Sequence, residues 1–546
     1  MCFFIQNLFR RLHLQNLIDI YSYIILVVLS FLTVADLELY KVWGYRIDAT
    51  PIRYFKHPKE MVASAGSSPV LLLLLIFAIL VIFSIWGYNS IVKKSAYYRG
   101  RSFFLALLSF ILLISLFIPI RGGFQQIPIN QSDVYFSNKI FANHAAVNLP
   151  WNVMHSILNK EANTANPYSY FSQSEARGIV DSLYKPNTSF ICNLLSVKRP
   201  NIIFIILESY TSKFIGCLGG EPGVTPHIDS IAKQGLLFTN IYASGDRSEK
   251  GLVALLSGYP TQTTTSIIFD PTKTEKLPHL QDFLKKEGYH SSYYYGGELE
   301  FANIKSYVLN SGYERLVSKS NFPSEDYNSK WGVHDHILLS KLQSDLKSEK
   351  QPFFTTIFTL SSHEPFEIPI PNKFPGNDET SKFKNSFYYT DQAIGTFITD
   401  ARKQLWWDST LIVMIADHGH RLPGEDANFV ASKFRIPLIL TGGALNEKGK
   451  INQTIGSQTD IAATILKSMG IPTGAFKWSQ DLMDSGLPHF AFYVFNDGFG
   501  FITKTGSVAF DNISKKVVYQ DTKIPGKELT TGKAYMQVSF EDFLNK

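Results

Sequence analysis

The stretch LIVMIADHGH, residues 411–420, decides the fold of this chain. Its first six residues are apolar, which is typical of a strand buried on both faces of a parallel sheet. Asp417, His418 and His420 follow at once, and such groups are costly to bury without partners. Ligands gather at the carboxyl ends of parallel strands. We therefore interpret the run as a buried strand that carries functional residues at its end.

Similar apolar runs recur after Pro200, and amphipathic stretches separate them. The other apolar runs are NIIFIILES (201–209), SSYYYGG (291–297), PFFTTIFTLSSH (352–363) and RIPLILTGG (435–443). The amphipathic stretches are HIDSIAKQG (227–235), HLQDFLKKEGY (279–289), HILLSKLQSDLKSE (336–349) and QTDIAATILKSMG (458–470). This alternation predicts an α/β fold with a mostly parallel sheet that helices cover on both faces.

Several of these strands end in residues that suit a site better than a core. Glu208 ends the first run, His363 lies in SSHEPF, and Asp417 and His418 end the strand quoted above. Two carboxylates and an imidazole are ligands for a divalent cation, and three protein ligands leave a position open. Glu208, Asp417 and His418 therefore predict a metal site.

The candidate nucleophile lies in YASGDRSEKGLVALLSGYP, residues 242–260. Ser248 follows a Gly-Asp-Arg turn and precedes a helical run that begins near Gly251, with Arg247 beside it. A helix N-terminus and a bound cation both favour an alkoxide over an alcohol. Ser248 is thus expected to act as nucleophile and to complete the metal shell.

Each of these residues also has an ordinary reading when it is taken alone. An acid at the end of an element can be a cap or a surface charge, and Ser248 can be a helix N-cap. His363 can be a histidine that is merely hydrogen-bonded. Their joint position at strand ends favours one shared site. The roles of four further residues stay open at this point: His334, His336, His420 and Lys250.

The order of these motifs resembles the sulfatase-like branch of the alkaline phosphatase superfamily. The motifs are strand-Glu-Ser, TPHIDSIAKQGLLFTNIYA (225–243), the basic and hydroxyl pair at 247–248, S-x-H-x-P-F (361–366) and A-D-H-G (416–419). The pattern is most similar to the lipoteichoic acid synthase family of membrane-anchored phosphoglycerol transferases. The resemblance covers about residues 199–485.

The resemblance implies a role for each matching residue. Ser248 takes the place of the family's catalytic threonine, and His363 and Arg247 are expected at the substrate phosphate. One divalent ion is implied, with manganese expected and magnesium or zinc as alternatives. Its ligands would be Glu208, Ser248, Asp417 and His418. The implied reaction transfers a phosphoglycerol-type head group from a phospholipid donor to a glycan or glycolipid acceptor through a phosphoserine-type intermediate.

The sequence also departs from the family pattern. Serine replaces threonine at 248, and ELEFANIKSY (298–307) lacks the Trp and Arg that Gram-positive members use around glycerol phosphate. The alternatives are a phosphoethanolamine transferase, a phosphodiesterase or phosphatase on the same site, and a glycolipid-binding pseudoenzyme. Ser-Glu-Lys-Gly-Leu is not the motif that sulfatases convert to formylglycine, which disfavours a sulfate ester hydrolase.

Three apolar stretches near the N-terminus predict membrane spans, at about 17–36, 70–88 and 102–120. The first has a cleaved signal peptide as its alternative. Basic residues before the first span and between the second and third predict cytoplasmic loops. The chain is therefore expected in the bacterial cytoplasmic membrane as a multi-pass protein with an extracytoplasmic catalytic domain. Its net charge of +6 gives no argument for a nucleic-acid partner.

The predicted domain order has four parts. A transmembrane region (1–121) precedes an extracytoplasmic linker (122–198) and a sulfatase-like catalytic domain (199–485). A small, β-rich closing unit (486–546) ends the chain. Of the three cysteines, only Cys192 and Cys217 could pair outside the cytoplasm. The oligomeric state cannot be read from the sequence.

Overall fold

The computed structural model divides into two compact units, residues 1–162 and 163–546. It describes residues 15–43, 46–47, 69–92, 103–124, 128–137, 139–158, 165–185, 193–424, 426–496, 498–522 and 526–546. Cys192 lies outside the described residues, and so do the basic residues that set the predicted orientation, Arg10, Arg11, Lys93, Lys94, Arg99 and Arg101. Cys217 is free and half-buried.

The first unit contains three helical segments that are long and apolar enough to cross a membrane. They coincide with the three predicted spans and run over Asn16–Tyr40, Val70–Ile91 and Phe103–Arg121. The helices that form them are α2 (Gln15–Trp43), α5 (Val70–Gly87), α6 (Phe103–Ser115) and α7 (Phe117–Arg121). Two short helices, α8 (Ile140–Ala146) and α9 (Leu149–Leu158), complete this unit.

The first apolar segment contains three acids, and the partners of two of them, Asp19 and Asp36, are clear. The Tyr88 hydroxyl donates to Asp19 Oδ1 at 2.8 Å where α2 packs against α5. Asp36 accepts from the Ile47 backbone N–H at 2.7 Å and pairs with Arg46 at 3.3 Å. Because an unpaired carboxylate is expensive in an apolar environment, these contacts make α2 compatible with a span.

The second unit is built on an eight-stranded sheet with the order β4-β3-β5-β1-β6-β7-β2-β8. Its strands are β1 (Asn201–Leu207), β2 (Leu236–Tyr242), β3 (His290–Tyr295), β4 (Arg315–Val317), β5 (Phe353–Phe358), β6 (Thr410–Ala416), β7 (Arg435–Thr441) and β8 (Lys450–Ser457). Within this described sheet β7 alone runs opposite to its neighbours. The prediction of a mostly parallel sheet is confirmed.

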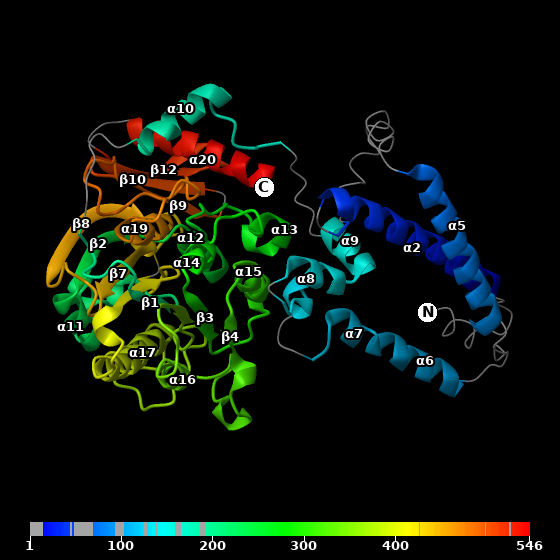
Figure 1. Cartoon of the computed structure of the whole chain (residues 1–546), viewed down its shortest axis with the longest axis horizontal. Helices are drawn as coiled ribbons and strands as arrows, with labels where there is room; N and C mark the ends of the chain where they lie inside the picture. The colour runs from blue at the N-terminus through cyan, green and yellow to red at the C-terminus, as the bar shows by residue number, and fades with distance from the viewer. Residues whose placement is uncertain are drawn as a thin grey trace. The chain divides into compact units, whose positions relative to one another are not determined.

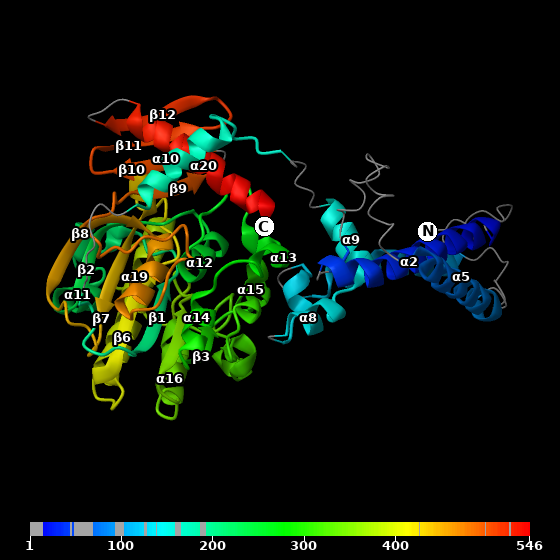
Figure 2. The same ribbon diagram turned by 45° about the horizontal axis from the view of Figure 1, so that its top comes forward.

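Helices cover both faces of this sheet (Figures 1 and 2). One layer holds α11 (Pro226–Gln234), α16 (Asp335–Asp345) and α17 (Glu379–Ala401), which pack on one another. The other holds α12 (Ser248–Ser257), α14 (Leu280–Lys286), α15 (Ile304–Asn310) and α19 (Ile461–Ser468). All residues of β1 and β6 are buried between these layers, which explains why both strands are apolar after their first residue.

The sheet register brings the predicted site residues together. β1 lies between β5 and β6, and Leu207 pairs with Ala416 at the carboxyl end. Glu208 and Asp417, the next residue on each strand, are therefore neighbours at one edge of the sheet.

The C-terminal part forms a second, antiparallel sheet in the order β12-β11-β10-β9. Its strands are β9 (Ala491–Phe495), β10 (Gly498–Thr503), β11 (Gly506–Asp511) and β12 (Lys516–Thr522). Helix α20 (Lys527–Asn545) packs on this sheet, and α10 (Gln173–Leu183) packs along α20 (Figure 2). The predicted linker 122–198 thus contributes helices to both units.

Candidate active site

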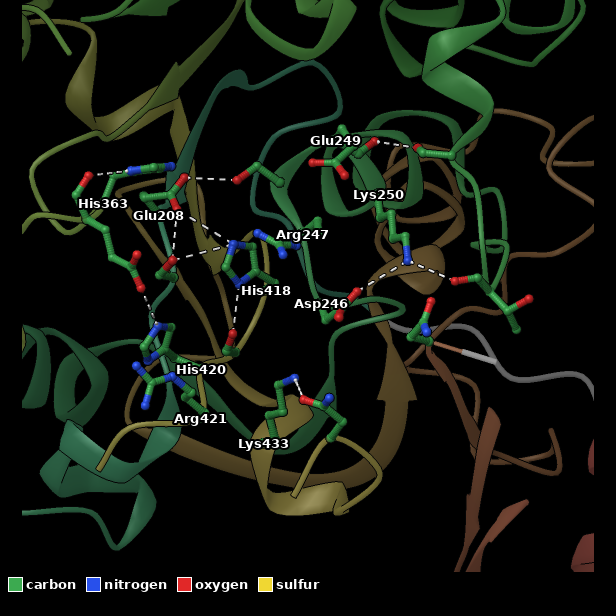
Figure 3. A pocket seen from close by; sticks show the side chains of 18 of the residues that line it. Glu208, Asp246, Arg247, Glu249, Lys250, His363, His418, His420, Arg421 and Lys433 are labelled. Atoms are coloured by element: carbon green, nitrogen blue, oxygen red, sulfur yellow. Dashed lines mark hydrogen bonds and ion pairs between the residues drawn. The ribbon is translucent and has the colours of Figure 1, made fainter. Parts of the chain in front are cut away.

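Three buried side chains converge at the carboxyl ends of β1 and β6. Figure 3 shows two of them, Glu208 and His418, facing each other. Glu208, Asp417 and His418 each offer one ligand atom, and these atoms lie within 4.8 Å of one another. His418 Nε2 is 3.6 Å from Glu208 Oε1 and 3.6 Å from Asp417 Oδ2. Two carboxylates and an imidazole at these separations form a possible site for one divalent cation.

Backbone and hydroxyl groups hold the two carboxylates in place. The Ser209 N–H donates to Asp417 Oδ1 at 2.8 Å, and its hydroxyl donates to Glu208 Oε1 at 2.8 Å. Ser209 reaches both by adopting a φ of 57°, which is uncommon for a residue other than glycine. The other oxygen of Asp417, Oδ2, is buried and has no hydrogen-bond partner among the described residues. An orphaned carboxylate oxygen aimed into an acidic cluster fits a cation ligand.

The charges of this cluster perturb one another strongly. Burial and the charge of Glu208 raise the pKa of Asp417 to about 8. Burial also opposes ionisation of Glu208, but the His418 hydrogen bond and the charges of His363 and His418 hold its pKa at about 2. For His418, burial alone would lower the pKa, and the charges of Asp417 and Glu208 raise it to about 10. The metal-free cluster therefore retains protons that a cation would displace.

Ser248 stands at the first position of α12, directly above this cluster. Its hydroxyl is buried and donates to Glu208 Oε2 at 3.1 Å. The helix can approach so closely because its fourth residue is Gly251. A Cβ atom at Gly251 would lie 1.9 Å from the Asp417 carbonyl oxygen. The Ser-Glu-Lys-Gly sequence thus sets the Ser248 hydroxyl close to the end of β6.

A cavity of about 650 Å³ opens over the cluster. His363 and Arg247 both line it, together with Ser248, Glu208 and His418. The His363 ring lies against Trp331 with 4.5 Å between ring centroids, and its Nδ1 is 2.9 Å from the Glu364 carbonyl oxygen. Arg247 is exposed at the mouth. The predicted nucleophile, the two residues predicted for the phosphate and two of the predicted metal ligands, Glu208 and His418, therefore share one pocket, whereas Asp417 is fully buried beside them.

A family model described as Sulfatase matches residues 200–471, the segment that contains this whole constellation. The chain therefore contains a sulfatase-family domain. A protein of the alkaline phosphatase superfamily from Vibrio parahaemolyticus has a similar structure, with a TM-score of 0.61 and 26% identity. That match covers 70% of this chain and 98% of the other. The predicted sulfatase-like fold is thereby confirmed.

Two curated relatives of this chain are, by name, a lipoteichoic acid synthase-like protein and a phosphoglycerol transferase. The lipoteichoic acid synthase-like protein YvgJ of Bacillus subtilis is 23% identical over 381 residues, which cover 63% of this chain and 59% of the relative. Phosphoglycerol transferase I of Xanthomonas campestris pv. campestris is 26% identical over 311 residues, which cover 53% of this chain and 44% of the relative. This chain thus matches about half of the length of these relatives.

The residues whose roles the sequence left open have structural partners. The His420 ring packs on Phe383 at 4.3 Å, and burial lowers its pKa to about 3. His334 Nδ1 lies 3.3 Å from the Ser361 hydroxyl. His336 contacts the Tyr389 hydroxyl. The Lys250 ammonium pairs with Asp246 at 3.2 Å.

Asp335 fixes the loop that leads to His363. It is fully buried and accepts from the Leu360 N–H at 2.7 Å and from the Thr390 hydroxyl at 2.6 Å. Ser362 in the same loop donates to the Glu208 carbonyl at 2.6 Å. The loop after β5 is therefore fixed against both α16 and the end of β1.

Sequence reasoning missed Ser209, Gln458 and Lys433. Nothing in the local sequence marks Ser209 for a left-handed conformation. Gln458 donates to the carbonyls of Ala416 and Asp417 at 2.8 and 2.5 Å, across 41 or more residues of chain. Lys433 lines the pocket from the segment before β7. Lys433 lies in the sequence SKF, which matches none of the motifs described above, so the sequence did not indicate a role for it.

Proposed function

We propose that this chain is a membrane-anchored, metal-dependent transferase. In this proposal it moves a phosphoglycerol-type head group from a phospholipid to a glycan or polyol acceptor. The observation that supports it best is the placement of the Ser248 hydroxyl at a helix N-terminus, 3.1 Å from Glu208 in a cluster with a possible metal site. The name of one curated relative, phosphoglycerol transferase I, supports a phosphoglycerol head group.

Each side chain of the site has its own role in the proposed reaction. Glu208, Asp417, His418 and Ser248 would hold one divalent cation, with manganese as the expected ion. Such an ion lowers the pKa of a bound hydroxyl and neutralises charge on phosphate oxygens. Ser248 attacks phosphorus and the diacylglycerol leaves, so that the head group is held as a phosphoserine ester. An acceptor hydroxyl then attacks the same phosphorus and displaces Ser248. Arg247 offers a guanidinium fork, and His363 a ring nitrogen, for the phosphate oxygens.

The anchor and the site suit a lipid donor. Three helices near the N-terminus are long and apolar enough to span a bilayer. We propose that they are membrane spans, that the segment between the second and third is cytoplasmic, and that the second unit lies outside the bacterial cytoplasmic membrane. A donor in the outer leaflet would then present its head group on the same side as the pocket.

Intact mass spectrometry of the full chain in detergent tests the function. The wild type is incubated with Mn²⁺ and phosphatidylglycerol beside Ser248→Ala. A gain of one phosphoglycerol on the wild type and none on the variant is the expected result. If phosphatidylethanolamine labels Ser248 instead, the donor assignment is wrong and the nucleophile is right. If Mn²⁺ binds and neither lipid labels Ser248, the transferase proposal fails.

A further inference from the structure

Away from the metal cluster, the same pocket contains a second group of charged residues. Arg247, Lys250, Lys433 and Asp246 all line it. The Lys250 ammonium pairs with Asp246 Oδ1 at 3.2 Å and donates to the Thr263 carbonyl at 3.4 Å, so Asp246 already has a close cationic partner. Figure 3 shows Lys433 on the same side of the pocket as Asp246.

Lys433 is a buried cation without a close counter-ion. Its side chain is 8% exposed, and its ammonium donates to the neutral Asn428 side-chain oxygen at 2.9 Å. Within the described part of the chain, no carboxylate lies within ion-pair distance of it. Burial lowers its pKa, and the charges of Arg247 and Lys250 add to this effect while Asp246 opposes it. An ammonium group has three donors, and a buried charge is costly unless it is paired.

The backbone fixes Lys433 beside the catalytic segment. It lies in α18 (Ala431–Phe434), immediately before β7. Its carbonyl oxygen would be 1.8 Å from a Cβ atom at Gly419, the residue after His418. The position of Lys433 is therefore coupled to that of the possible metal ligands, although it does not belong to their cluster.

We propose that Lys433 and Asn428 form a subsite for a second oxyanion of the substrate, beyond the phosphate that is transferred. The inference rests on the proposed function and deepens it. The oxyanion supplies the counter-ion that the Lys433 ammonium lacks, and the Asn428 amide offers the oxyanion a further donor. The oxyanion is a phosphate or carboxylate on the acceptor, or a second phosphate on the donor lipid.

A matched pair of acceptors tests this subsite. The full chain in detergent, with Mn²⁺ and phosphatidylglycerol, is assayed with glycerol 3-phosphate and with glycerol. We expect kcat/KM to favour glycerol 3-phosphate, and Lys433→Gln to reduce this preference by about tenfold or more, the value of a charged hydrogen bond. Lys433→Arg keeps the preference. Lys403→Gln, which removes an exposed charge just after α17, leaves it unchanged.

The donor arm compares Ser248 labelling by phosphatidylglycerol and by cardiolipin without acceptor. If Lys433→Gln impairs labelling by cardiolipin but not by phosphatidylglycerol, the second oxyanion belongs to the donor. If Lys433→Gln lowers the rates with glycerol and glycerol 3-phosphate equally, Lys433 serves the transferred phosphate and the proposal is wrong.

A binding measurement separates this inference from the proposed function. Glycerol 3-phosphate is titrated calorimetrically into the EDTA-treated full chain, where no turnover is required. About tenfold weaker binding to Lys433→Gln than to the wild type supports the subsite even if no lipid labels Ser248. Equal affinities of the two proteins overturn it.

Discussion

At the scale of single residues, protonation and metal binding compete at Asp417. In the metal-free protein its carboxyl group has a pKa raised to about 8, chiefly by burial. A cation requires the ionised form, so below that pH each binding event must displace the proton. The affinity for a cation therefore rises as the pH increases toward 8, because less of the protein carries the competing proton.

We therefore expect the Kd for Mn²⁺ to fall between pH 6 and 8, by up to about tenfold per pH unit for each proton displaced. Calorimetry in two buffers of different ionisation enthalpy measures the released protons. Asp417→Asn should abolish the binding, and Asp400→Asn on the surface of α17 should leave it unchanged. A Kd that is independent of pH would contradict the prediction.

A second residue-scale prediction concerns the serine at 248. Threonine supplies the same hydroxyl and adds a methyl group that restricts χ1. We expect Ser248→Thr to remain active and Ser248→Ala to lose about a thousandfold or more in kcat, as is typical when a nucleophile is removed. Initial rates of head-group transfer by the wild type and the two variants measure these effects. Equal losses in both variants would show that the site does not accommodate the methyl group.

Among the helices and strands, the residues at the ends of the buried strands were predictable from the sequence. The residues that hold these strand ends in place, such as Ser209 and Gln458, were not. The apolar runs identified β1, β3, β5, β6 and β7, because a strand buried on both faces has few alternatives in composition. The grouping of Glu208, Asp417 and His418 followed from the rule for parallel strands. The antiparallel direction of β7 did not, since it depends on a chain path that has no local signature. Helix α20 was missed for the same reason.

The approach of α12 to β6 gives an element-scale prediction. Because a Cβ atom at Gly251 would meet the Asp417 carbonyl at 1.9 Å, Gly251→Ala should displace the helix and with it Ser248. We expect weaker Mn²⁺ binding and loss of Ser248 labelling. Gly178→Ala in α10 is the matched control, because nothing lies within 4 Å of its added atom. It should stabilise the helix by about 0.5–1 kcal/mol. Wild-type Mn²⁺ affinity in Gly251→Ala would contradict this account.

At the scale of the whole molecule, charge decides on which side of the membrane each part lies. Basic residues are retained on the cytoplasmic side of short loops, and Lys93, Lys94, Arg99 and Arg101 lie between the second and third apolar helices. The second unit, which follows the third helix, should then be outside. The lipid-donor proposal depends on this orientation, because the donor head group must face the pocket.

Cysteine labelling in spheroplasts tests the orientation, with the three native cysteines replaced by serine. Leu405 is fully exposed on the second unit, so Leu405→Cys should react with a membrane-impermeant maleimide in intact cells. Ser95→Cys, among the basic residues, should react only after the membrane is permeabilised. If Ser95→Cys were labelled in intact cells and Leu405→Cys were not, the pocket would face the cytoplasm. An outer-leaflet donor would then be excluded, whatever the chemistry at Ser248.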